Sequence, residues 1–120
     1  MITESYPTAS VPVSSSFTTI ATAPVKANAI YLITFSFDYV SASGENNVRT
    51  FDRIRFVPSS GTEVTVALVQ NDNGLYNGGG VSMSAIYIPT SDGEIKGQAR
   101  HWSSSNKSVG NVNFKVYRLE

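Results

Sequence analysis

Cysteine is absent from the 120-residue chain, and charged residues make up only 15% of it. The absence of cysteine excludes disulfide scaffolds, cysteine-ligated zinc sites and thiol catalysis. Basic and acidic residues are equal in number, nine of each, whereas a nucleic-acid-binding protein normally carries a basic excess. We therefore expect no nucleic-acid partner. Ser and Thr together supply 27 residues and Asn another nine, so the expected surface is polar but largely uncharged.

Long hydrophobic runs are also missing. The most apolar stretch, Ala27–Val40, is interrupted by Thr34, Ser36 and Asp38 and is too short to span a bilayer. The region Met1–Ser16 has neither the basic start nor the apolar run of a signal peptide. We therefore expect synthesis in the cytoplasm of the producing cell, with no secretion signal and no membrane insertion.

Helical periodicity is nearly absent, because Gly, Pro, Ser, Thr and Asn interrupt every window of helical length. Alternation with a period of two recurs instead, and this pattern is typical of half-buried strands. It is clearest in Ala29–Tyr39, where one face carries only large apolar residues: Tyr31, Ile33, Phe35, Phe37 and Tyr39. We expect this strand to lie at the centre of the core.

Further strands are predicted from the same alternation, over Val48–Val57, Thr62–Val69, Val81–Ile88, Glu94–Trp102 and Asn111–Leu119, with one or two edge strands in Val11–Val25. Pro12 and Pro24 suit sheet edges. The segment Thr62–Val69 is apolar on both parities and is predicted to be central or covered on both faces. Turn pairs such as Asp92-Gly93 separate the strands. Seven or eight such strands indicate a β-sandwich.

The only His and the only Trp of the chain, His101 and Trp102, are adjacent at a predicted strand end. Neighbouring strand residues point to opposite faces, so both cannot belong to the core. A Trp at the mouth of a loop is suited to stacking on a sugar ring. The alternative is that Trp102 closes the end of the sandwich or a subunit interface.

A second candidate is the glycine-rich connection Asn71–Gly80, which carries Asp72, Asn73, Tyr76 and Asn77. Carboxylate and amide groups beside a tyrosine match the hydroxyl groups of a glycan. A plain flexible loop is the alternative. The start of this connection resembles part of a calcium loop, but the acidic residue needed downstream is missing, so we expect no metal.

A third candidate is a row of arginines on one strand face. Arg49, Arg53 and Arg55 share this face with Phe51 between them, while Asp52 lies on the opposite face. Guanidinium groups in a row are suited to an anionic sugar, such as a sialic acid or teichoic acid derivative. The alternative is a solvated face, or a face that pairs with acids across a subunit interface.

Catalysis has little support in the sequence. The chain has no Gly-x-Ser-x-Gly nucleophile motif, a single His and nine scattered acidic residues. We therefore expect a protein that is not an enzyme and that uses no cofactor.

The segment Ser84–Leu119 resembles a known family in the order of its parts. An apolar strand, a turn with Gly93, a strand ending at Trp102 and a Ser/Asn-rich loop precede a closing strand that ends in Tyr-Arg-Leu. With the aromatic strand IYLITFSF, this order resembles the C-terminal jelly roll of bacteriophage tail-tip and tail-fibre proteins. Those heads are similar in turn to the tumour-necrosis-factor and complement globular-head jelly rolls. In these families the turn usually reads Gly-Asp and an aliphatic residue, whereas here Asp92 precedes Gly93.

The resemblance implies a homotrimer displayed on a virion, where loops or subunit clefts bind a host cell-surface glycan or protein. Together with the strand pattern, it predicts an all-β, single-domain jelly-roll-like sandwich of about seven or eight antiparallel strands over residues 9–120. For residues 1–8 we expect a flexible N-terminal arm, and the alternative is the remnant of a longer protein from which the domain was cut. The predicted function is host recognition by a phage structural protein. The alternatives are a capsid decoration or tail-assembly protein that contacts only other virion subunits, and a free carbohydrate-binding module or lectin. The predicted ligand contacts are Trp102, His101, Tyr76, Asp72, Asn73, Asn77 and Arg53.

Overall fold

The computed structural model describes residues 3–5, 11–13, 16–41, 49–71, 79–102 and 107–119. Within these ranges the regular structure is entirely β, as the sequence predicts. The strands are β1 (Thr3–Ser5), β2 (Val11–Val13), β3 (Thr18–Val25), β4 (Tyr31–Ser41), β5 (Arg49–Pro58), β6 (Val64–Asn71), β7 (Gly79–Tyr87), β8 (Gly93–Trp102) and β9 (Lys107–Arg118).

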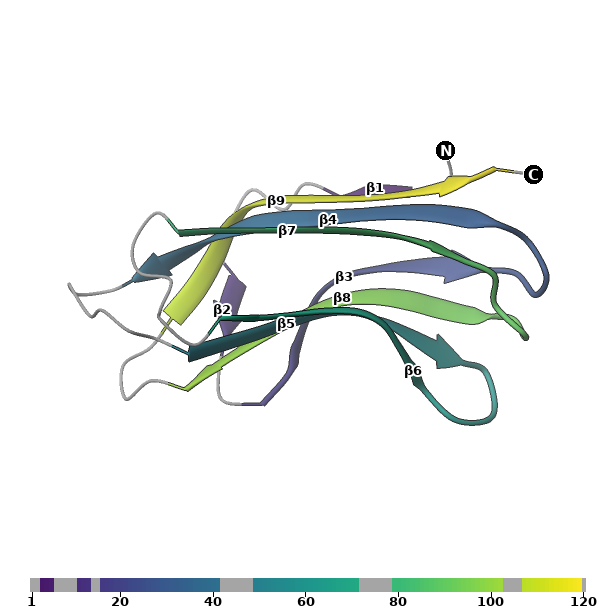
Figure 1. Ribbon diagram of the computed structural model, residues 1–120, viewed down its shortest axis with the longest axis horizontal. Helices are drawn as coiled ribbons and strands as arrows, with labels where there is room; N and C mark the ends of the chain where they lie inside the picture. Colours follow the sequence, from purple (N-terminus) through teal and green to yellow (C-terminus); the bar gives the residue numbers. More distant parts are fainter. Residues whose placement is uncertain are drawn as a thin grey trace.

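The strands form two antiparallel sheets that face each other as two layers (Figure 1). Sheet A has the order β1-β9-β4-β7, with β2 also paired to β9, and sheet B has the order β3-β8-β5-β6. Because β1 and β2 pair with successive parts of β9, they act as one interrupted strand. From β2 onward the chain changes sheet at every connection except the β5–β6 hairpin. This is the connectivity of a jelly roll, and the predicted jelly-roll sandwich is confirmed.

The core lies between the sheets and is dominated by β4. All five apolar residues predicted to share one face of this strand are buried, none of them more than 2% exposed. Phe35 packs edge-on against Phe114 of β9, with ring centres 5.8 Å apart. From the other sheet, Gly97 lies directly under the Phe35 ring, and a Cβ at this position would come within 2.8 Å of it. The glycine therefore lets β8 approach the aromatic core.

The prediction for the segment that forms β6 is wrong. Its apolar residues on both parities predicted a central or doubly covered strand, but β6 is an edge strand of sheet B. Ala67 and Val69 pack against the core, whereas Val64 is 40% exposed and Leu68 is 53% exposed. The opposite edge of the sheet is β3, which agrees with the expectation drawn from Pro24.

The segment predicted as a flexible N-terminal arm contains β1. Thr3, Glu4 and Ser5 pair with Val116, Lys115 and Phe114 of β9. This part of the segment is therefore held to the edge of sheet A, and the rest of it lies outside the described residues.

Candidate functional site

The connections predicted to bind a ligand leave from one end of the sandwich. Asn71, at the end of β6, pairs with Thr50 near the start of β5, and Gly79, at the start of β7, pairs with Tyr39 near the end of β4. Trp102, at the end of β8, pairs with Arg49 at the start of β5. Trp102 thus reaches the predicted place at a strand end, but its side chain lies outside the described part of the structure. The candidate ligand contacts of the glycine-rich connection also lie outside the described ranges, namely Asp72, Asn73, Tyr76 and Asn77.

His101 lies inside the sandwich rather than on a ligand surface. Its side chain is 3% exposed, and its Nε2 atom is 2.8 Å from the carbonyl oxygen of Val13. The ring therefore links the end of β8 to β2. This burial corrects the prediction that His101 contacts a ligand, because the alternation along β8 turns this residue toward the core.

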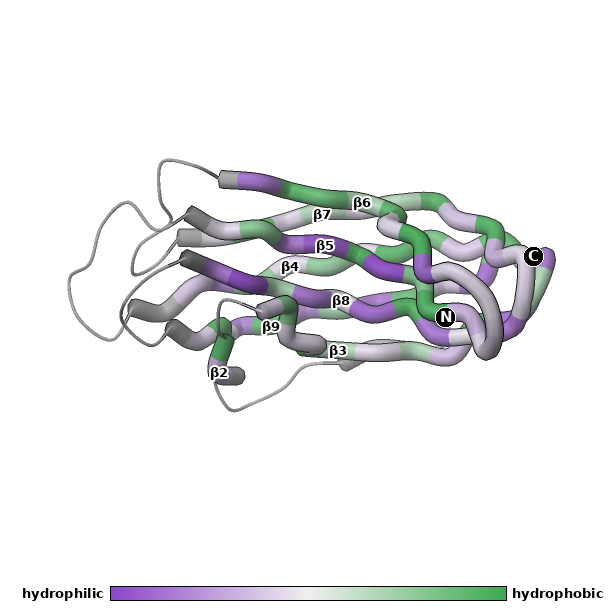
Figure 2. The backbone as a smooth tube through the Cα atoms, turned by 90° about the horizontal axis from the view of Figure 1, so that it is seen from below, coloured by the Kyte–Doolittle hydropathy of each residue, from purple (hydrophilic) through white to green (hydrophobic). Residues whose placement is uncertain are grey.

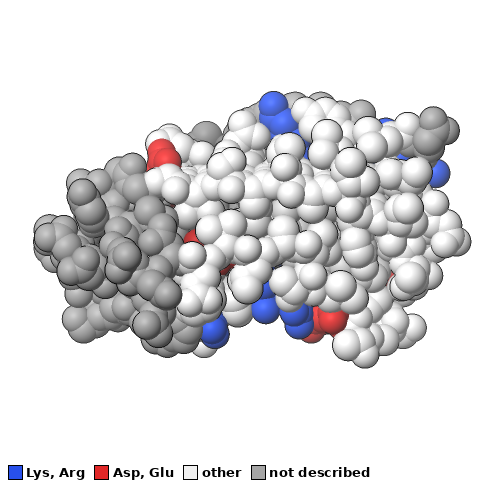
Figure 3. All heavy atoms as spheres, in the orientation of Figure 1, with Lys and Arg blue, Asp and Glu red and all other residues white. Residues whose placement is uncertain are grey.

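Two arginines of the predicted row share one face with further basic residues, while the side chain of Arg49, the third, lies outside the described part of the structure. Arg53 and Arg55 lie on the outer face of sheet B, which Figure 2 shows from below, with hydrophilic residues along β5 and β8. Because Arg55 pairs with Lys96 and Phe51 pairs with Arg100, strand β8 adds two further basic residues to the same face. Figure 3 shows Lys and Arg gathered along this side of the molecule. Four of the nine basic residues therefore lie together, although the chain carries no net charge.

Two aromatic rings lie among these basic groups. The centre of the Phe17 ring is 3.6 Å from Cζ of Arg53 and 4.5 Å from Cζ of Arg100. The Phe51 ring is 4.8 Å from Cζ of Arg100. These distances are those of cation–π contacts. The guanidinium groups are thus packed against apolar surface and are less free to move than isolated surface arginines.

A hydrogen-bonded chain across the sheet also fixes Arg53. Its Nε atom donates to Oε1 of Gln98 at 2.7 Å, and Nε2 of Gln98 donates to Oγ1 of Thr19 at 3.1 Å. These contacts join strands β5, β8 and β3. We call this surface the arginine face, made of Phe17, Phe51, Arg53, Arg55, Lys96, Gln98 and Arg100.

Positive charge on the arginine face is only partly neutralised. Arg55 donates to Glu63 at 3.3 Å and also to the Thr65 hydroxyl, whereas Arg53 makes no ion pair with a carboxylate in the described ranges. Loss of solvent lowers the pKa of Arg53, and the nearby positive charges of Arg55 and Arg100 lower it further, with Glu63 acting in the opposite direction. An anion placed over Arg53 would offset this repulsion.

Beneath the arginine face, polar side chains of β5 turn into the core. Asp52 is fully buried, and its Oδ1 atom accepts a hydrogen bond of 2.6 Å from the Tyr39 hydroxyl in the opposite sheet. Burial raises the pKa of Asp52 to about 7, although the nearby Tyr39 and Thr50 hydroxyls act in the opposite direction. Burial and the Asp52 carboxyl also raise the pKa of Tyr39. The hydrogen bond between Tyr39 and Asp52 therefore joins the two sheets, and this link depends on the protonation state of the Asp52 carboxyl.

Among the residues that the structure places, no helix has the length and apolar character needed to cross a membrane. In the same set, no three His, Asp or Glu side chains lie close enough together to hold a metal ion. The arginine face itself presents guanidinium, ammonium and amide groups, which act mainly as hydrogen-bond donors.

Sequence reasoning identified one strand of this face and missed the other contributions. The outward orientation of Lys96 and Arg100 follows from the alternation in β8, but their position beside β5 depends on strand order. Phe17 precedes a strand and carries no local signal of its role. The charge pattern gives no signal for this pairing, because like charges directly opposite each other on neighbouring strands, such as Arg55 and Lys96, are destabilising.

No protein-family model matches the chain, and no curated protein sequence matches it. Among solved structures, the chain is similar to VP2 of infectious bursal disease virus, in a crystal structure of a subviral particle. The TM-score is 0.69 at 15% sequence identity, and the match covers 92% of this chain and 30% of the VP2 chain. The chain thus spans under a third of the length of that viral protein. At this identity the likeness shows the fold alone, a jelly-roll sandwich of the kind found in a viral protein.

Proposed function

We propose that the chain is a structural domain of a virus particle and that it serves in host recognition, binding an anionic group of a cell-surface glycan on its arginine face. The main support for the proposal is the position of Arg53, whose guanidinium lies between Phe17 and Gln98 without a carboxylate partner in the described ranges. The jelly-roll topology and the likeness to a protein of a subviral particle support a place in the virion. The resemblance to phage tail-tip and tail-fibre heads makes a bacteriophage the favoured setting.

The chemistry of binding follows from the groups on this face. A guanidinium binds a carboxylate, sulfate or phosphate through two parallel hydrogen bonds. The exposed part of an aromatic ring can pack against the apolar side of a sugar. One such site binds weakly, and several copies held on one particle raise the overall avidity by about 10²–10⁴. The proposed role is therefore adsorption by binding, without catalysis.

Binding can be tested with two glycans that differ by one charged sugar. Calorimetric titration of the full chain with sialyllactose and with lactose should detect binding of the charged ligand and weaker or no binding of the neutral one. Arg53→Gln should weaken sialyllactose binding about tenfold or more, because a charge-assisted hydrogen bond is lost. Arg118→Gln is the matched control, since it removes the same charge from a strand of the opposite sheet.

Equal binding of sialyllactose and lactose, or equal effects of the two arginine substitutions, would contradict a role of the arginine face in anion recognition. Binding of a teichoic-acid-type glycerol phosphate oligomer instead of sialyllactose would support anion recognition and change only the glycan class. Tighter binding of a single-stranded oligonucleotide than of either glycan would overturn the proposal in favour of nucleic acid.

A homotrimer is the proposed assembly. The outer face of sheet A supports self-association, because Ile86, Leu32 and Tyr117 lie in one cross-strand row and Ile86 is 68% exposed. Light scattering after size exclusion should give a mass near three times 12.9 kDa, and Ile86→Lys should reduce it. A monomeric wild type would contradict the trimer and favour a free carbohydrate-binding module. A trimer that binds no glycan would favour a capsid decoration or tail-assembly role.

A further inference from the structure

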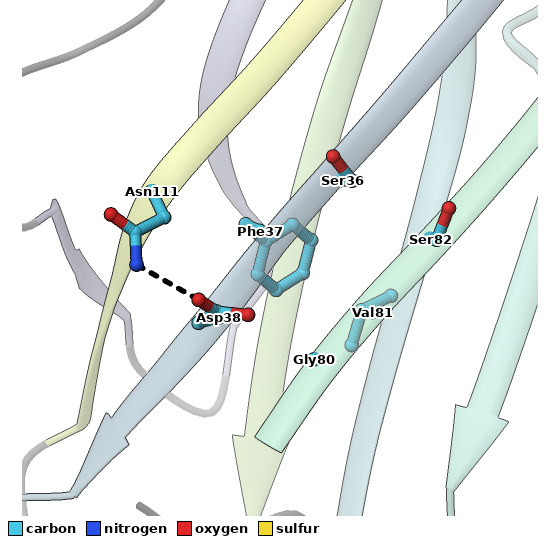
Figure 4. Close-up of a pocket in the computed structure, with 7 residues that line it drawn as sticks. All are labelled: Ser36, Phe37, Asp38, Gly80, Val81, Ser82 and Asn111. Carbon is cyan, nitrogen blue, oxygen red and sulfur yellow. Dashed lines mark hydrogen bonds between the residues drawn. The ribbon is translucent and has the colours of Figure 1, made fainter. Parts of the chain in front are cut away.

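A hollow lined by both polar and apolar groups lies on the outer face of sheet A, on the side of the molecule opposite the arginine face. It has a volume of about 270 Å³ and is lined by residues of three neighbouring strands, namely Ser36, Phe37, Asp38, Gly80, Val81, Ser82 and Asn111 (Figure 4). Phe37 and Val81 belong to the core, so the polar groups of the other side chains provide the chemistry of the hollow. The volume is somewhat below that of pockets for drug-sized ligands and suits a single sugar ring.

The hollow exists because Gly80 has no side chain and the neighbouring Ser36 and Ser82 have short ones. Gly80 pairs with Asp38 across β7 and β4, and a Cβ on Gly80 would lie 3.2 Å from Oδ1 of Asp38. In the next row, Ser36 pairs with Ser82. Figure 4 shows the hydroxyl groups of these two serines on neighbouring strands. The hollow therefore has a shallow floor, with a carboxylate at one end and two hydroxyls at the other.

A β-bulge places the amide group at the rim of this hollow. Pairing between β4 and β9 passes from Asp38 with Gly110 to Ser36 with Asn113, so two residues of β9 lie opposite one residue of β4. Asn111 is the first of these two and has a left-handed backbone, with φ of 52°, which Asn tolerates better than most residues. Its Nδ2 atom donates to Oδ2 of Asp38 at 2.9 Å (Figure 4). The carboxylate is thereby fixed in orientation.

These groups match the hydroxyls of a neutral sugar better than they match a basic side chain. A sugar hydroxyl both donates and accepts, as the two serine hydroxyls do, and it can donate to the Asp38 carboxylate. A lysine or arginine side chain of a partner offers donors only and would leave the donor capacity of the serines unused.

We propose that this hollow binds a neutral pyranose, with Asp38 accepting hydrogen bonds from adjacent sugar hydroxyls and Ser36 and Ser82 contacting the neighbouring hydroxyls. The inference goes beyond the proposed function, because it assigns a second ligand class to the opposite sheet and uses none of the residues of the arginine face.

The test is titration of the full, isotopically labelled chain with methyl α-glucopyranoside, methyl α-galactopyranoside and methyl α-mannopyranoside at millimolar concentrations, followed by amide chemical shifts. At least one of the three should shift the amides of the strand segments 36–38 and 80–82 in a saturable way. Ser82→Ala should weaken this binding about fivefold to tenfold, as expected for the loss of one hydrogen bond. Gly80→Ala should weaken it at least as much, because the added methyl group occupies the hollow.

The matched control is Ser84→Ala, which makes the same chemical change two residues along the same exposed strand face, outside the lining of the hollow. It should leave the affinity for the hexoside unchanged, and so should Arg53→Gln, which separates this site from the arginine face. The inference is overturned when no hexoside shifts these amides, or when Ser82→Ala and Ser84→Ala have the same effect. Shifts caused by free arginine but by none of the hexosides would also overturn it, by assigning the hollow to a basic group.

Discussion

The buried carboxyl of Asp52 gives the most quantitative prediction. Its pKa rises from an ordinary value of 3.8 to about 7 in the folded chain, a change of about 3 units at 1.36 kcal/mol per unit. At pH values between these two pKa values, the Asp52 carboxyl is protonated in the folded chain and ionised in the unfolded chain. The contribution of Asp52 to stability is therefore complete below about pH 4 and is lost as the pH rises through about 7. The expected loss is about 4 kcal/mol in the free energy of unfolding.

Asp52→Asn removes this titration while it keeps the shape of the side chain and an oxygen for the Tyr39 hydroxyl. Urea unfolding of wild type and variant across a series of pH values should show a difference that changes with pH. The variant should gain up to about 4 kcal/mol relative to wild type as the pH rises from below 4 to above 7. A difference that stays constant over this range would refute the reasoning.

Asp92→Asn provides a contrast of opposite sign. The backbone N–H of Ala27 donates to Asp92 at 2.9 Å, and this hydrogen bond, with the charge of Lys26, lowers the pKa of Asp92. A carboxyl with a lowered pKa stabilises the fold near neutral pH and loses that effect as the pH falls through the folded value. This variant should therefore be less stable than wild type at neutral pH, and the difference should narrow in acid.

Three further substitutions test the packing and the site. Gly97→Ala should lower the free energy of unfolding by about 1–3 kcal/mol in urea titrations, because the Cβ would meet the Phe35 ring at 2.8 Å; an unchanged midpoint would contradict this packing. His101→Ala should lower the melting temperature by removing the hydrogen bond to Val13 while calorimetry finds unchanged affinity for sialyllactose. A loss of affinity without a loss of stability would return His101 to the ligand surface. Phe17→Ala should weaken sialyllactose binding a few-fold by releasing the two guanidiniums, with little change in melting temperature; unchanged affinity would remove Phe17 from the site.

The parts of this fold that depend on local alternation could be predicted from the sequence. The buried face of β4, the outward arginines of β5 and the outward Lys96 and Arg100 of β8 all follow from a period of two. The β-sandwich class follows from the number of such segments. Strand order does not, because it depends on contacts between residues far apart in the chain. The exposed edge position of β6 therefore differs from the prediction.

The candidate sites show the same division. Arg53 was predicted from its strand, whereas the contact with Phe17 depends on the pairing of β8 with both β3 and β5. The hollow at Asp38 could not be predicted, because the bulge at Asn111 interrupts the alternation of β9. Val109, which precedes the bulge, and Val112, which follows it, are both buried in the core. In a regular strand, two residues three positions apart would point to opposite faces.

The most direct test of the central claim is to map where sialyllactose binds on the labelled wild-type chain by amide chemical shifts. We predict saturable shifts around Phe17, Arg53, Gln98 and Arg100, with lactose causing no shifts in this region. Shifts confined to other parts of the chain, or identical shifts from both glycans, would contradict the assignment of the arginine face as an anion-recognition site.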